Sequence, residues 1–157
     1  MKRKSRYSYT ASALCGLLLS LCLGAAAHPL PHTPRKIDEY GNLPFKLEKE
    51  RLHNFALALK NESEGIGLIV VYAGRRACAG EAVARAIRAR NYLIKEHGVG
   101  WDKVMWRDGG YREGLTVDLW ILPRGAINLS LTPTLDPKDV RVGRCGHKAH
   151  ARRARGR

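Results

Sequence analysis

The sequence predicts an α/β fold, a two-layer sandwich in which helices cover one face of a small mixed sheet. Three observations lead to this class. Two segments carry apolar residues at helical spacing, three carry the dense or alternating apolar pattern of strands, and they follow one another as helix, strand, helix, strand, strand. The chain has 157 residues, which is enough for one ordinary domain.

Two amphipathic helices are predicted. The first begins after Asn42, with Pro44 suited to the first helical position, and its apolar residues recur at steps of three and four. The second runs from about Glu81 to His97, with an acid in its first turn and basic residues in its last. Gly98 is expected to end it, because glycine readily adopts the left-handed conformation that closes a helix.

Three strands complete the pattern. Residues 66–73 form a dense, β-branched run typical of a central strand, and residues 103–107 and 115–122 alternate apolar and polar side chains. The glycines of residues 108–113 predict a turn between the last two strands. Further on, a short extended piece is expected at residues 140–142.

A right-handed crossover through the second helix predicts a functional edge. It makes the strands at 66–73 and 103–107 parallel, so the loops 74–80 and 108–113 should face each other where these strands end. The expected ligand-binding residues are Arg75, Arg76, Arg85, Tyr111 and Arg112. Guanidinium groups beside a helix N-terminus favour anions. A solvated basic surface remains the alternative.

The charge is unevenly distributed. The chain has 28 Lys and Arg against 14 Asp and Glu, a net charge of +14. Four basic residues and no acid fall in residues 1–27, eight basic residues and one acid fall in residues 138–157, and residues 28–137 keep only +3. This excludes a uniformly basic domain such as a histone-like fold.

The basic N-terminus predicts a signal peptide. A positive segment precedes 17 uncharged residues, 11–27, which end on three alanines, the small-residue pattern of a cleavage site. This run is short of the about 20 residues that a spanning helix needs, although an uncleaved anchor is the alternative. We expect cleavage near Ala27, no membrane anchor afterwards, and a periplasmic or secreted protein.

Export changes the cysteine count. Two of the four cysteines leave with the signal peptide, and Cys78 and Cys145 remain in an oxidising compartment. We predict that they form a disulfide, the alternative being two unrelated thiols. The expected organisation is a signal peptide (1–27), a Pro-rich leader (28–36), the α/β domain (37–123) and an irregular, basic, disordered tail (124–157).

Several short motifs match a known family. Arg85-Ala86, Tyr92-Leu93 and Gly98-Val99 have the spacing of one family helix, and residues 103–109 match the strand that follows it. In these motifs the chain resembles the OmpA-like domain, by which outer-membrane protein A and related envelope proteins hold peptidoglycan. Residues 37–43 are similar to the leading strand and turn of that family, which completes a βαβαββ order.

The resemblance implies a peptidoglycan ligand, held in the family by an aspartate and by the helix arginine. Arg85 matches the arginine, but Gly74-Arg75-Arg76 stands where the family has Gly-His-Thr-Asp, and the aspartate is missing. Two arginines in that loop should prefer carboxylates or phosphates to an amine.

These observations predict a non-enzymatic, exported domain that binds peptidoglycan or another anionic envelope polymer, without cofactor or metal. Glu81, Asp108 and Glu113 could be imagined as catalytic carboxylates, but beside so many arginines they are more simply ion pairs. One alternative is a module that docks another envelope protein. Another is a binder driven by the cationic tail, with anionic membrane or, non-specifically, nucleic acid as its partner.

Overall fold

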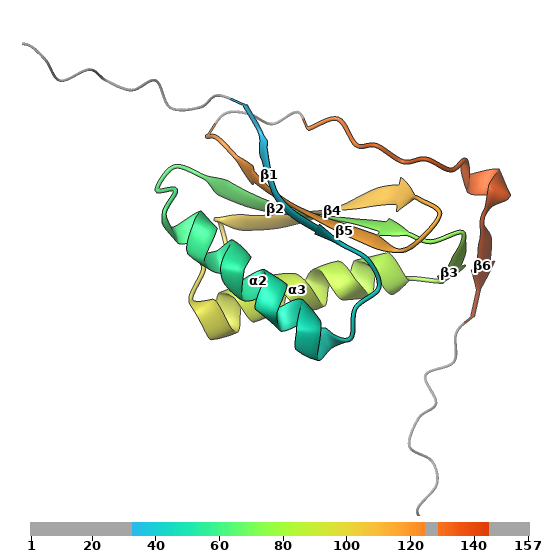
Figure 1. Cartoon of the computed structure of the whole chain (residues 1–157), viewed down its shortest axis with the longest axis horizontal. Helices are drawn as coiled ribbons and strands as arrows, with labels where there is room; N and C mark the ends of the chain where they lie inside the picture. The colour runs from blue at the N-terminus through green and yellow to red at the C-terminus, as the bar shows by residue number, and fades with distance from the viewer. Residues whose placement is uncertain (1–32, 125–128, 145–157) are drawn as a thin grey trace, which may run out of the picture. The chain divides into compact units, whose positions relative to one another are not determined.

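The computed structural model describes residues 33–124 and 129–144, and in it two helices lie on one face of a mixed sheet (Figure 1). This confirms the predicted fold class. The helices are α2 (Phe45–Lys60) and α3 (Glu81–His97). Four strands form the sheet in the order β1 (Arg35–Tyr40), β5 (Thr116–Leu122), β2 (Ile66–Ala73) and β4 (Val104–Tyr111).

The sheet is mixed because it contains both parallel and antiparallel strand pairs. β5 is antiparallel to both β1 and β2, whereas β2 and β4 are parallel and joined through α3. β1 and β4 are therefore the edges of the sheet. A separate two-stranded sheet pairs β3 (Arg76–Cys78) with β6 (Arg141–Gly143), and a short 3-10 helix, η2 (Pro137–Asp139), precedes β6.

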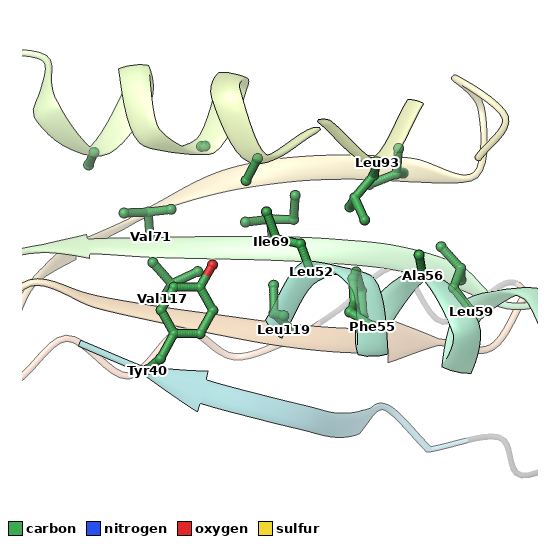
Figure 2. Close-up of a cluster of buried hydrophobic side chains, with 14 of the residues drawn as sticks. Tyr40, Leu52, Phe55, Ala56, Leu59, Ile69, Val71, Leu93, Val117 and Leu119 are labelled. Carbon is green, nitrogen blue, oxygen red and sulfur yellow. The ribbon is translucent and has the colours of Figure 1, made fainter. Parts of the chain in front are cut away.

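The core lies between the helices and the sheet, as Figure 2 shows. From α2 it receives the buried side chains that were spaced three and four residues apart in the sequence, among them Leu52, Phe55 and Leu59. From the sheet it receives Ile69 and Val117, with others of the same face. α3 contributes mainly alanines, whose small side chains let the helix lie close to the sheet.

The ends of the helices follow the sequence closely. Pro44 precedes the first residue of α2, and α3 has the predicted bounds. Gly98 closes α3 with φ +63°, the left-handed conformation expected of a glycine at that place.

The turn predicted at residues 108–113 is wrong for residues 108–111, because β4 continues to Tyr111. Gly109 lies against the ring of Tyr72, where an added Cβ would come within 2.5 Å of Cε1. The register shifts between Val71 and Ala73, and Gly110 has φ +84°. The glycines thus form an irregular strand end rather than a turn, and the turn occupies residues 112–115.

The opposite face of the sheet is partly covered by the chain that follows β5. Leu129 and Leu131 pack against a second buried cluster that includes Leu68, Val70 and Tyr72. Residues 138–144, assigned from their composition to a disordered tail, instead complete η2 and form β6, where the extended piece was expected.

The N-terminal segment falls outside what the structure describes. This applies to the predicted signal peptide, residues 1–27, and to most of the Pro-rich leader, of which the last two residues begin β1. Within residues 33–124 and 129–144, no helix is both long and apolar enough to span a bilayer.

Candidate binding site

A hollow of about 320 Å³ opens where β2 ends. One wall is the segment that follows β2, with Gly74, Arg75 and Arg76. The turn between β4 and β5 supplies Glu113, and Asn42, before α2, closes a third side. Because β2 and β4 are parallel, the segments that follow them meet at the same end of the sheet, as the crossover predicted.

Arg75 is paired within this hollow. Its Nε donates to Oε2 of Glu113 at 2.9 Å and its Nη2 to Oε1 at 2.6 Å, a two-point contact between guanidinium and carboxylate. This hydrogen bonding to Arg75 is the main reason that the pKa of the Glu113 carboxyl is lowered. The charge of Arg75 is therefore largely neutralised before any ligand arrives.

Arg76 offers its charge to the hollow. It is the first residue of β3, its side chain is exposed, and among residues 33–124 and 129–144 it forms no ion pair within 4.0 Å. β6 adds a second cation, because Arg141 is the register partner of Arg76 in the parallel β3–β6 ladder. Neighbouring register partners present their side chains on the same face of a ladder.

Sequence reasoning missed Arg141, because it lies 65 positions from Arg76 in the chain and only the β3–β6 pairing brings the two together. A backbone hydrogen bond holds Arg141 there, since its N–H donates to the carbonyl of Arg75, the residue before β3, at 2.9 Å. A basic residue inside the short extended piece expected at residues 140–142 was the only signal, and it did not indicate a partner.

Arg85 does not line the hollow. The residue is only 8% exposed, and its Nη2 donates to Oδ1 of Asn42 at 2.6 Å while its Nη1 donates to the carbonyl of Leu43 at 3.2 Å. Glu48 is its nearest carboxylate, at 3.8 Å. Arg85 therefore supports the Asn42 wall from within the fold, and its guanidinium is not presented to a ligand.

The two predicted residues from the other loop also lie elsewhere. Arg112 is turned to the opposite face of the sheet, where Nη2 is 3.1 Å from Asp118 Oδ2 and the guanidinium carbon is 3.6 Å from the ring centroid of Tyr72. Tyr111 packs against the core cluster beneath the helices. Of the five predicted binding residues, the structure brings only Arg75 and Arg76 to the hollow.

The three acids considered as ion-pair partners divide into two kinds. Glu113 pairs with Arg75, as expected. Glu81 instead accepts a hydrogen bond from the backbone N–H of Cys78 at 3.3 Å, and Asp108 accepts one from the N–H of Gly110 at 2.9 Å. Within the part of the chain that the structure describes, no three His, Cys, Asp or Glu side chains gather as metal ligands.

The predicted disulfide stays a prediction, because Cys145 lies outside the described residues. The structure does show that Gly143, near the end of the described residues, lies beside Cys78. Cys78 is the register partner of Gly143, and the N–H of Ala79 donates to the carbonyl of Gly143 at 3.0 Å. Cys145 is two residues further along.

Comparison of the chain with family models, with curated proteins and with solved structures finds no match. The class is therefore defined by the fold and the hollow alone. It is a mixed α/β domain that presents a pair of arginines beside a polar hollow at the end of its central strand.

Proposed function

We propose that this chain is a non-enzymatic, exported module that binds an anionic component of the cell envelope, with the carboxylates of peptidoglycan stems as its ligand. One observation carries the proposal. Arg76 lines an open hollow without an ion pair among the described residues, whereas Arg75, Arg85 and Arg112 are each engaged within the fold.

Two guanidinium groups side by side suit a carboxylate. Arginine binds carboxylates through two parallel hydrogen bonds, which fixes orientation as well as adding affinity. Arg76 and Arg141 present such groups on one face of the β3–β6 ladder. The hollow lies at the N-terminal end of α3, where the helix dipole adds a favourable potential for a negative group.

The acidic residues of the hollow narrow the class of ligand further. Glu81 and Glu113 line it together with the arginines, so the local charge is mixed rather than uniformly positive. A stem peptide carries both carboxylates and amines, and it can satisfy both signs. The only charged groups of a nucleic acid are its phosphates, which Glu81 would repel.

The resemblance to the OmpA-like domain supports the same ligand class. The elements occur in the order strand, helix, strand, helix, strand, strand that the resemblance implies, apart from the short β3, η2 and β6. Gly74-Arg75-Arg76, which stands where that family has its ligand loop, forms a wall of the hollow. We assign no catalysis, since the carboxylates at the hollow are held by Arg75 and by a backbone N–H.

The test is co-sedimentation with purified cell-wall sacculi. Arg76→Glu should lower the bound fraction about tenfold, because it replaces a charge-assisted contact by a repulsion. Lys95→Glu is the matched control: this cation is also exposed and forms no ion pair among the described residues, but it lies in the last turn of α3, away from the hollow. A chain ending at Gly146 separates the contribution of the five basic residues that follow.

The variants distinguish the alternatives. If Arg76→Glu pellets like Lys95→Glu, the hollow has no part in wall binding. Loss of binding only in the shortened chain would indicate a tail-driven, salt-sensitive interaction with any anionic surface. Absence of wall binding in every form, with a protein partner that co-purifies with the shortened chain, would support a protein-docking module.

A further inference from the structure

β4 is an edge strand with an open side. Gly67 N–H donates to the carbonyl of Lys103 at 2.8 Å, which fixes the alternation of this parallel pair. Lys103, Met105 and Arg107 therefore turn their backbone groups toward β2. Val104, Trp106 and Asp108 turn theirs outward, away from the sheet.

Among residues 33–124 and 129–144, only the far end of this edge is covered. Leu135 forms an antiparallel bridge with Tyr111, whose carbonyl accepts hydrogen bonds from the N–H groups of Thr134 and Leu135. Pro137, which has no N–H, begins η2 two residues later and ends the pairing. Among the described residues, no strand pairs with the outer side of residues 104–108.

Large apolar side chains border the open part. Trp101 is 75% exposed and Met105 is 44% exposed. Together with Trp106 they line a hollow of about 480 Å³ along the edge. Folded proteins usually cover or blunt such an edge, because its unpaired backbone groups are a template for another strand.

Two charged groups at the same edge have no oppositely charged partner in the described part of the chain. Arg90, on α3, donates from Nε to the carbonyl of Val104 at 2.9 Å and from Nη2 to that of Trp101 at 2.8 Å. No ion pair within 4.0 Å joins Arg90 or Asp108 to any group in residues 33–124 and 129–144. Both lie on the helix side of β4, since Val104 and Val71, the register partner of Asp108, belong to that core cluster.

One antiparallel register joins these features in two copies. If β4 meets β4 of a second copy with Trp106 opposite itself, Val104 of each copy faces Asp108 of the other. Asp108 of the second copy then lies beside the carbonyl that Arg90 holds, and its carboxylate meets the guanidinium. A twofold axis repeats the contact, so both unpaired charges of both copies are matched.

The neighbouring registers of this strand pair place like charges opposite each other. Centring the pair on Met105 places Lys103 opposite Arg107, and centring it on Arg107 places that arginine opposite itself. With Trp106 at the centre, no like charges are directly opposite, and Met105 lies over the stem of Arg107. We propose that the chain forms a symmetric dimer through β4, centred on Trp106 and fixed by two Arg90–Asp108 ion pairs.

The dimer is tested by sedimentation equilibrium of the purified chain over a range of concentrations. Asp108→Arg and Arg90→Glu should each raise the dimer dissociation constant about tenfold or more, because each places like charges together twice. Mixing the two variants should restore association, since a mixed pair has both contacts of opposite sign. Glu50→Arg, an exposed charge reversal on α2, is the matched control and should dimerise like the wild type.

Met105→Lys is an independent test of the dimer that leaves Arg90 and Asp108 in place. It should weaken dimerisation, because a lysine at a sheet edge opposes strand pairing. Its control is Ile87→Lys, at an equally exposed position (42%) on α3. The proposal is overturned if the wild type is monomeric throughout, or if Asp108→Arg and Met105→Lys associate like their controls. Folded Asp108→Arg and Arg90→Glu chains that stay monomeric when mixed would overturn the ion pairs.

Discussion

At the scale of single residues, a buried carboxylate organises the contact between β1, α2 and α3. Glu48 has no exposed surface. Arg88 Nη2 lies 2.5 Å from Oε2, and the hydroxyl of Tyr40 donates to Oε1 at 3.2 Å. Burial first, and then the nearby Glu48 carboxylate, raise the pKa of Tyr40 well above its usual value, so its hydroxyl stays protonated as a donor.

Arg85→Ala should therefore act on stability rather than on a ligand. The substitution removes a charge 3.8 Å from Glu48 and leaves Asn42 and the carbonyl of Leu43 without their donor. We expect a loss of about 3 kcal/mol in the free energy of unfolding, measured by urea denaturation. Arg76→Ala, at an exposed arginine without an ion pair among the described residues, should change it by less than about 0.5 kcal/mol. Equal effects of the two would contradict the structural role of Arg85.

The sequence could not separate these arginines. Arg85 lies on α3 beside buried Ala82, Ala86 and Ala89, and helical spacing places it at the margin of the apolar face. Whether such a side chain reaches solvent or a buried acceptor depends on the segment opposite. Here that segment is residues 42–43, which lie more than forty positions away in the chain, and no local pattern points to them.

At the scale of elements, the end of β4 depends on two glycines and one aromatic ring. Gly109 leaves room for Tyr72, whose hydroxyl is 3.5 Å from the Oγ1 of Thr132 in the segment that covers this face. The sequence showed the glycines but not their use, because a turn and an irregular strand end both favour glycine. Elements with strong periodicity, β2 and α3, were predicted with their observed bounds.

Gly109→Ala should lower the free energy of unfolding by about 2 kcal/mol, since the new methyl group would collide with the Tyr72 ring. Gly114→Ala is the control: nothing lies within 4 Å of a Cβ added at this position, and the φ of Gly114 is not positive. We expect it to be neutral or slightly stabilising. Thermal or urea unfolding of both variants measures the difference, and a Gly109→Ala chain as stable as Gly114→Ala would show that Tyr72 adapts freely.

At the scale of the whole molecule, the chain after β5 returns to the binding hollow. It partly covers one face of the sheet with Leu129 and Leu131, bridges β4 at Leu135, and pairs with β3 as β6. This path places Arg141 next to Arg76, so the proposed site depends on a segment that sequence patterns assigned to an irregular tail. Composition describes such a segment as basic and polar, but only its pairing with β3 gives it a position.

The predicted disulfide would fix this arrangement. Cys78 is opposite Gly143, and Cys145 follows Gly143 by two residues in the sequence. Closing so long a loop of chain contributes about 4 kcal/mol to stability in the chain-entropy model. We expect the exported chain, freed of its signal peptide, to resist alkylation of Cys78 and Cys145 unless it is reduced, as intact mass measures.

The same link should matter for binding as well as for stability. A Cys78→Ser, Cys145→Ser chain should unfold at lower urea concentration, and it should bind sacculi more weakly than the wild type because the β3–β6 hydrogen bonds alone then hold Arg141 beside Arg76. Reducing agent should lower the urea stability and the sacculus binding of the wild type to the values of this variant. It should leave both values of the variant unchanged. Two thiols that alkylate without reduction would disprove the disulfide, and the β3–β6 hydrogen bonds would then be what holds the two arginines together.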